Sequence, residues 1–180
     1  MPTQARERLV HAAEELFYRE GIRAVGVERL LAVSGVGRAS FYRHFSSKDD
    51  LVVTMLRGYD RRWRQWLDEE VTARGRAPLT VFDALAESFG QDSFRGCASI
   101  NAMVELADPD SQAFQVAAEH KRSLIEYLDG LLADAGYRDH AVLADQFVLL
   151  IDGAIITALR ERTAEPALRA KAIAAALLGS

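Results

Sequence analysis

The side chains best suited to contact a nucleic acid lie close together in one short segment, residues 37–48. Guanidinium and hydroxyl groups can hydrogen-bond to base edges in a DNA groove, and phenol, imidazole and ammonium groups can hold phosphates. Phe41 and Phe45 give the same segment an apolar side that can face a protein core. The side chains expected at the surface are Arg38, Ala39, Ser40, Tyr42, Arg43, His44 and Lys48.

Charge is unevenly distributed along the 180 residues. The chain has a formal net charge of −4, but residues 1–48 carry eight basic and five acidic side chains. The remaining residues carry 14 basic and 21 acidic side chains. Because a phosphate backbone attracts local rather than total positive charge, this distribution fits a protein that docks its N-terminal part on DNA. Ordinary scatter of surface charge explains the same counts, so charge alone does not decide.

Hydrophobic periodicity predicts an all-α fold of about nine helices, because no run of alternating β-branched residues is long enough for a strand. Gly21 is expected to end the first helix, Pro78 to lie in the first turn of the fifth, and Asp108 with Pro109 to open the seventh. The expected helices lie around residues 9–17, 27–31, 37–44, 51–67, 81–89, 96–107, 109–136, 139–162 and 165–178.

Two of these helices, around residues 27–31 and 37–44, are short and are joined by the turn Ser34-Gly35-Val36, as in a helix-turn-helix unit. Over residues 8–51, without a gap, the sequence resembles the N-terminal domain of the TetR family of transcriptional repressors. The resemblance is carried by Ala12-Ala13, Leu16-Phe17, Gly21-Ile22, Leu30, Ser34-Gly35-Val36, Phe41-Tyr42-Arg43-His44-Phe45 and Lys48-Asp49-Asp50-Leu51.

The resemblance implies a DNA-binding domain at residues 1–48 and a helical effector-binding and dimerisation domain at residues 49–180. It also implies a homodimer that binds a palindromic double-stranded operator. Release by a small, mostly apolar effector is predicted from the difference in charge and aromatic content between the two parts of the chain. By position in the motif, Arg38 and Ser40 would read bases. Tyr42, His44 and Lys48 would face phosphates.

Three positions depart from the pattern of the family. Gly26 and Gly37 stand where a Ser or Thr usually opens the second and third helices, and Leu31 stands where an Ala is usual. Glycine can cap a helix, but it removes a hydroxyl contact at each place. We therefore expect the docking mode to persist without these two hydroxyl contacts.

Catalysis and metal binding have no support in the residue pattern. The four histidines are scattered, and the chain has a single cysteine, Cys97, with no histidine near it in sequence. No cofactor, metal or enzymatic activity is expected. The single cysteine indicates a reducing compartment, the cytoplasm, and neither a signal peptide nor a membrane span is expected. The alternative function is a helical ligand-binding or protein-interaction module without DNA binding, which the polar set on residues 37–48 disfavours.

An effector pocket is predicted from aromatic and soft side chains in the C-terminal part. Asn101 and Glu105, one helical turn apart, would be buried polar groups that need partners, on a face that also holds Cys97. Hydrogen bonds to a neighbouring helix end would explain both polar groups equally well. Cys97 is not expected to be a redox sensor, because a buried thiol in apolar surroundings is inert. The predicted pocket residues are Tyr59, Trp63, Phe89, Cys97, Asn101, Glu105 and Phe114.

A homodimer is predicted from the helix around residues 139–162, which is apolar almost all round. Such a helix needs burial on two sides, and the Ala-rich helix after it offers small side chains that let a partner come close. Burial of both helices inside a monomer is the alternative. The predicted interface residues are Phe147, Ile151, Ile155, Leu159 and Ile173.

Overall fold

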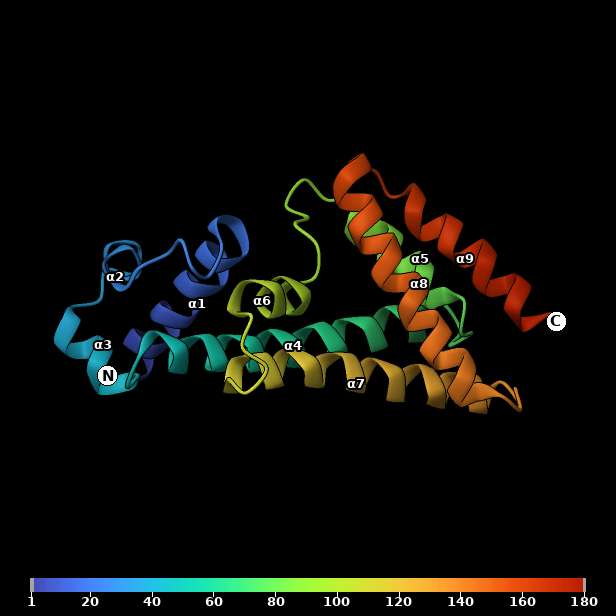
Figure 1. The fold of residues 1–180 in the computed structure, drawn as a ribbon, viewed down its shortest axis with the longest axis horizontal. Coiled ribbons are helices and arrows are strands. Elements are labelled where there is room, and N and C mark those ends of the chain that lie inside the picture. The colour runs from blue at the N-terminus through green and yellow to red at the C-terminus, as the bar shows by residue number, and fades with distance from the viewer. Residues whose placement is uncertain (1, 180) are drawn as a thin grey trace. The chain divides into compact units, whose positions relative to one another are not determined.

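A computed structural model describes residues 2–179, and side chains from Gln4 onward. Within this range the chain is entirely helical, with nine helices and no strand, which confirms the predicted all-α class (Figure 1). The helices are α1 Pro2–Glu20, α2 Val27–Ser34, α3 Arg38–His44, α4 Lys48–Ala73, α5 Thr80–Phe89, α6 Ala98–Leu106, α7 Gln112–Asp134, α8 His140–Glu161 and α9 Glu165–Leu178.

Packing divides the chain into two compact units. The first contains the residues up to Arg61 together with Ala98–Glu119, and the second contains Arg62–Cys97 and the described residues from His120 onward. Helices α4 and α7 therefore each contribute to both units. This division differs from the functional boundary after residue 48 that the sequence predicts, which stays a prediction.

The first unit has one hydrophobic core, to which six helices and the loop between α1 and α2 contribute. Leu9 of α1, Leu30 of α2 and Phe41 of α3 are fully buried in it, and so is Ala102 of α6. The apolar side of α1 recurs every three or four residues, which is the spacing that places side chains on one face of a helix. Its buried members are Leu9, Ala12, Ala13, Leu16 and Phe17.

The turn between α2 and α3 is fixed by a glycine and an arginine. Gly35 ends α2 in the left-handed conformation, with φ of 62°, and its N–H donates to Leu31 O. Arg8 of α1 donates from Nε to Ser34 O at 2.8 Å, and its Nη2 contacts the same carbonyl. A Cβ on Gly35 would lie 2.6 Å from Arg8 Nη2. The left-handed backbone therefore favours glycine here, and an added Cβ would also displace the end of the Arg8 side chain.

Two expected helix starts are wrong, for identifiable reasons. Pro78 lies before α5, which begins at Thr80, because residues 77–79 form a turn closed by the Thr80 N–H donating to Ala77 O. Asp108 does not cap α7. Its carboxylate accepts from Asp110 N in a local turn, and the helix begins at Gln112 with Ser111 Oγ accepting from Phe114 N at 3.2 Å.

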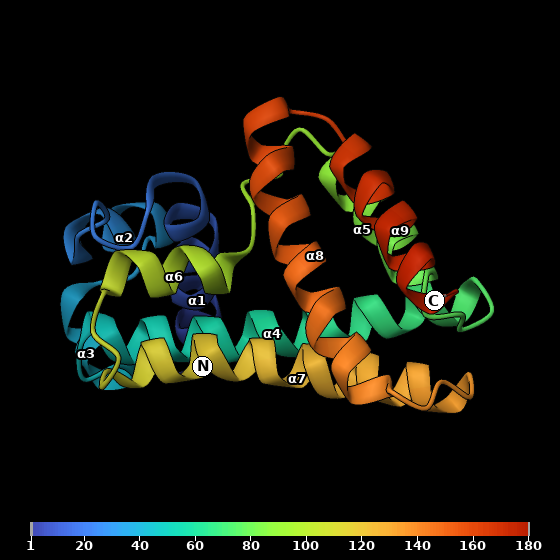
Figure 2. The ribbon, with the colours of Figure 1, turned by 45° about the vertical axis from the view of Figure 1, so that its right-hand side comes forward.

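The second unit packs α5, α8 and α9 together, with α5 and α8 both against α9 (Figures 1 and 2). The rings of Phe82 and Phe147 meet edge to face at 5.4 Å in its core. Lys171 of α9 donates to both carboxylate oxygens of Asp83 on α5, at 2.6 and 2.7 Å. These contacts fix α9 on the helices that precede it.

By length and composition alone, α8 could cross a membrane. Its most apolar window of 18 residues has a mean hydropathy of 1.9, and 39% of that window is buried inside the structure. The sequence predicts no membrane span, and α8 is packed against α9. Much of the apolar surface of α8 therefore stays exposed and is a candidate contact surface for a partner.

Replacing Gly35 with alanine should destabilise the helix-turn-helix. The left-handed backbone costs an alanine about 1 kcal/mol, and the new methyl group must displace Arg8 from Ser34 O. We expect Gly35→Ala to lower the free energy of unfolding by about 1 to 3 kcal/mol, measured by denaturant titration followed by circular dichroism.

Gly37→Ala is the matched control in the same turn. Gly37 has φ of −72°, and nothing lies within 4 Å of an added Cβ. We expect this change to cost less than about 1 kcal/mol, because alanine only caps a helix somewhat less well than glycine. Equal losses in the two variants would contradict the strain assigned to Gly35.

Candidate nucleic-acid interface

Helix α3 presents its polar side chains to solvent and buries one aromatic ring. Phe41 is fully buried and Phe45, just past the helix, is 2% exposed, with ring centroids 6.0 Å apart. Tyr42 stands edge-on to Phe41 at 5.1 Å and is 52% exposed. Because the helix is anchored on one side only, the other side is available to a partner. That side carries Arg38, Ala39, Tyr42 and Arg43, which are exposed, and Ser40 and His44, which are half-buried.

Arg38 forms an ion pair with Glu28 of α2, and both side chains are largely exposed. Exposed pairs of this kind contribute about 0 to 1 kcal/mol, so a stronger acceptor can capture the guanidinium at little cost. Glu28 is the one acidic residue among residues 26–48, which hold four basic residues. The surface around α2 and α3 is therefore cationic, and the ion pair with Glu28 leaves Arg38 available to a partner.

Lys48 at the start of α4 has a structural contact that the sequence does not reveal. Its ammonium donates to Ile22 O in the loop between α1 and α2 and lies 5.8 Å from the centre of the Phe17 ring. Partial burial lowers the pKa of Lys48, and the carboxylates of Asp49 and Glu105 oppose this effect. An ammonium has three protons, so a phosphate contact remains open to it.

The two glycines that depart from the family's pattern both act as N-caps. Gly26 and Gly37 have extended backbones at the starts of α2 and α3, and neither start has a side-chain cap. Orphan N–H groups at a helix start attract anions, and a phosphate oxygen can accept from them. Without these hydroxyls, backbone N–H groups at the starts of α2 and α3 have no side-chain cap.

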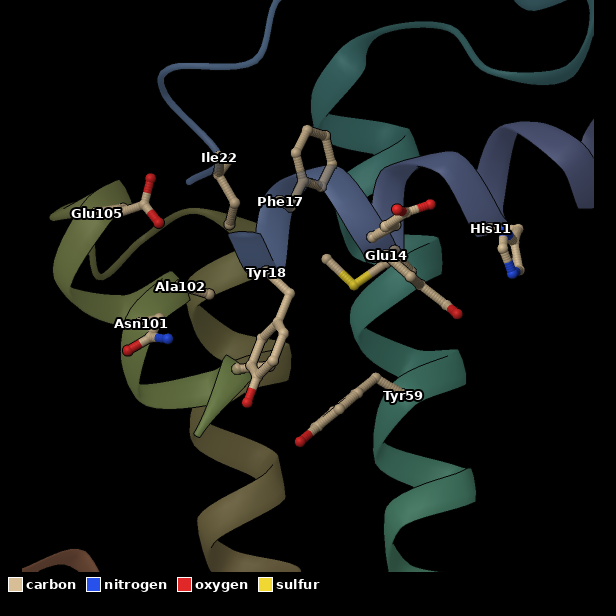
Figure 3. A pocket seen from close by; sticks show the side chains of 12 residues that line it. His11, Glu14, Phe17, Tyr18, Ile22, Tyr59, Asn101, Ala102 and Glu105 are labelled. Carbon is tan, nitrogen blue, oxygen red and sulfur yellow. The ribbon is translucent and has the colours of Figure 1, made fainter. Parts of the chain in front are cut away.

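A cavity of about 330 Å³ lies within the first unit, between α1, α4 and α6 (Figure 3). Three of the seven predicted pocket residues, Tyr59, Asn101 and Glu105, line it. The other lining residues are His11, Glu14, Glu15, Phe17, Tyr18, Ile22, Met55, Ala98 and Ala102.

The four other predicted pocket residues do not line this cavity. Trp63, Phe89 and Cys97 belong to the second unit, where Phe89 and Cys97 are buried and the Trp63 ring contacts His120 at 4.7 Å. Phe114 is half-buried on α7. Cys97 also precedes α6 instead of lying on one of its faces, because the helix begins at Ala98.

Sequence reasoning missed the wall that α1 provides. His11, Glu14, Glu15 and Tyr18 recur at intervals of three and four residues, which places them on one side of the helix. This second stripe, with its polar and aromatic side chains, is the signal in the sequence that could have identified the wall.

Glu105 connects α6 to the loop between α1 and α2. Its Oε2 accepts from the backbone N–H of Arg23 at 3.0 Å. Arg23 Nη2 in turn donates to Leu106 O at 3.3 Å. Gly21, which ends α1 with φ of 93°, lies so close that an added Cβ would be 3.0 Å from Glu105 Oε2. Glu105 therefore has both a place in the pocket and a structural contact.

The structure places three of the predicted interface residues in the core of the second unit. Phe147, Ile151 and Ile155 are buried within the protomer, so they cannot form a contact face, and Leu159 is half-buried. Ile173 is 53% exposed. Periodicity places the outward face of α8 elsewhere, at Val142, Leu149 and Ile156, which are exposed and seven residues apart.

The comparisons with known proteins agree with this geometry. The family of bacterial regulatory proteins named tetR matches residues 9–55. SCO4454, a TetR-family transcriptional regulator from Streptomyces coelicolor, has a sequence 31% identical to this chain. The structural match covers 99% of this chain and 97% of the SCO4454 chain, with a TM-score of 0.87.

Two curated regulators are more distant. The HTH-type transcriptional repressor NemR of Escherichia coli is 26% identical over 76% of this chain and 71% of its own, and its reduced form in the crystal has a TM-score of 0.83. The HTH-type transcriptional activator FasR of Mycolicibacterium smegmatis is 26% identical over 65% of this chain and 47% of its own. Taken with the helix-turn-helix, these similarities show that the chain belongs to the TetR family of transcriptional regulators.

Proposed function

We propose that the protein is a cytoplasmic, ligand-responsive repressor that binds a palindromic operator as a homodimer. The observation that carries the proposal is the exposed polar face of α3 over the buried Phe41. Regulators of this family bind DNA, dimerise and bind effectors. NemR, a similar protein, is a repressor, and we propose that this protein also represses transcription.

In the proposed docking, α3 enters the major groove. Arg38 leaves Glu28 to read a base edge, and Ser40 contacts bases beside it. Guanidinium groups bind guanine O6 and N7 through two hydrogen bonds, which gives sequence preference. Tyr42, Arg43, His44 and Lys48 hold phosphates, and Ala39 offers a methyl group to the groove.

The proposed dimer surface lies on α8 and α9. Val142, Leu149 and Ile156 form a stripe on α8, and Leu168 and Ile173 are exposed on α9. Gly153 of α8 faces solvent with open space where a Cβ would be, and Ala172, Ala175 and Ala176 are exposed on α9. Small side chains let two helices approach closely, so two such helix pairs can pack as a four-helix bundle about a two-fold axis.

The proposed effector site is the cavity between α1, α4 and α6. Its walls are mainly apolar and aromatic, as expected for a small ligand with an apolar body. Glu105 ties its α6 wall to the loop before α2. A ligand relieves repression only if it binds more tightly to a state that does not fit the operator.

Arg38→Ala should weaken operator binding by about 1 to 3 kcal/mol and relax the preference at one base pair. The lost contact is to a base and not to a phosphate. The slope of log affinity against log salt concentration should therefore change little, although the affinity itself falls. Fluorescence anisotropy with operator duplexes substituted at each position measures both effects.

Arg138→Ala removes an exposed arginine from the second unit and is the charge-matched control. We expect it to keep operator affinity and base preference. An Arg38→Ala protein with wild-type affinity and preference would refute the assignment of α3 as the reading helix.

Ile156→Glu should yield monomers and abolish tight operator binding. A carboxylate at a buried contact costs several kcal/mol, whereas on the surface of a monomer it costs little. Ile156 is 53% exposed in the protomer, so the fold should survive. Sedimentation velocity at micromolar concentration measures the oligomeric state.

Val104→Glu introduces the same charge at a residue of α6 that is 74% exposed. This control should sediment like the wild-type protein. If Ile156→Glu remains a dimer, or if the wild-type protein is a 19.9 kDa monomer, the proposed interface is wrong.

A further inference from the structure

The formally charged side chains that line the cavity between α1, α4 and α6 are all acidic. Three of its twelve lining residues, Glu14, Glu15 and Glu105, are carboxylates, and none is a lysine or arginine. Glu15 also forms an exposed ion pair with Arg19 at 3.2 Å, and Glu105 interacts electrostatically with the Lys48 ammonium, so part of the charge of both carboxylates is offset. Glu105 lies on the α6 wall beside Asn101, and His11 lies at the far end on α1 (Figure 3).

Aromatic and soft side chains form the rest of the walls. Tyr18 of α1 and Tyr59 of α4 extend their rings into the space between the helices (Figure 3). Phe17 and Met55 line the same cavity and are buried. The face of an aromatic ring is electron-rich and attracts a cation, most strongly where water is excluded.

These two properties together select a ligand class. An anion would be repelled by the carboxylates. A neutral apolar molecule would displace water from the carboxylates and supply neither hydrogen bonds nor an opposite charge in its place. A metal ion has no set of ligands, because among the described residues no three His, Cys, Asp or Glu side chains come close enough together to hold one. A positively charged group on an apolar body satisfies both the carboxylates and the rings.

We infer that this cavity binds an organic cation, an amine or quaternary ammonium with an apolar body, and that Glu105 is the carboxylate through which binding reaches the DNA-binding helices. The inference rests on the proposed function, because it names the effector class of the same site. Glu105 holds the Arg23 N–H at 3.0 Å, and Lys48 holds Ile22 O in the same loop.

A cation in the cavity competes with the Arg23 N–H for the Glu105 carboxylate. If Glu105 turns toward the ligand, the loop between α1 and α2 loses one of its hydrogen bonds to α6 and keeps the one from Arg23 Nη2 to Leu106 O. That loop leads directly into α2 and the turn to α3, so its loosening changes the position of the reading helix. The ligand and the loop contact thus exclude each other at one carboxylate, which makes ligand binding and operator binding antagonistic.

Phenyltrimethylammonium and tert-butylbenzene test the class, because they have the same shape and differ in a charged nitrogen against a neutral carbon. Benzenesulfonate serves as the anion. Isothermal titration calorimetry on the full chain without DNA should give a Kd at least about tenfold lower for the cation than for its neutral isostere, and no binding of the anion. Equal affinity for cation and isostere, or tighter binding of the anion, would overturn the inference.

Glu105→Gln keeps an oxygen that can accept from Arg23 N and removes the charge. It should weaken binding of the cation about threefold or more and leave binding of the isostere unchanged. Glu126→Gln, at an exposed residue of α7 in the second unit, is the matched control and should bind both like the wild-type protein. A Glu105→Gln protein with wild-type preference for the cation would contradict the role of Glu105.

Operator affinity, measured first without any probe, keeps this test separate from the test of the proposed function. If the operator binds and the cation has no advantage over its isostere, the ligand class is wrong and the repressor proposal stands. If the cation binds selectively but the operator does not bind at all, the proposed function fails and the pocket chemistry stands. Selective binding that leaves operator affinity unchanged at saturation would refute the coupling through Glu105.

Discussion

The DNA-binding helices share their hydrophobic core with helices from elsewhere in the chain. Ala102 of α6 and Val116 of α7 are buried in the same core as Leu30 and Phe41. A small three-helix unit buries a smaller share of its surface than a larger domain does, so the added helices stabilise it. Because cores are close-packed, a shift of α6 cannot leave its neighbours in place. The reading surface and the cavity are therefore parts of one packed body.

Helices α3 and α8 leave different kinds of surface exposed, because each is anchored differently in the core. On α3, one buried ring leaves the polar face free, and the charged side chains of that face are basic, with Arg38 paired to Glu28 of α2. On α8, residues such as Phe147 and Ile151 fill the core, and the opposite face is still apolar. A polar face suits a polyanion, and an apolar face suits a copy of itself. The proposed division of roles rests on this contrast.

The fold and helix α3 with its exposed polar face could be predicted from sequence because both depend on local signals. Glycine at residue 35, the spacing of apolar residues and the polar set around Phe41 each act within a few residues of chain. The cavity could not be predicted, because its α1 and α6 walls are about 80 residues apart and no periodicity pairs them. On α8, apolar residues on every side gave no indication that Ile155 faces inward and Ile156 outward. Lys48 was missed as a loop anchor because its acceptor is a backbone carbonyl.

Selection of bound sequences from a pool of randomised duplexes, followed by hydroxyl-radical footprinting on the selected DNA, tests the central claim most directly. The wild-type protein should select an inverted repeat, protect two half-sites whose centres lie about 34 Å or a multiple of it apart, and bind as two copies per duplex. Arg38→Ala should select the same repeat with one position relaxed in each half. A single protected site bound by one copy, or no enrichment of any sequence over the starting pool, would contradict a dimer that reads DNA through α3.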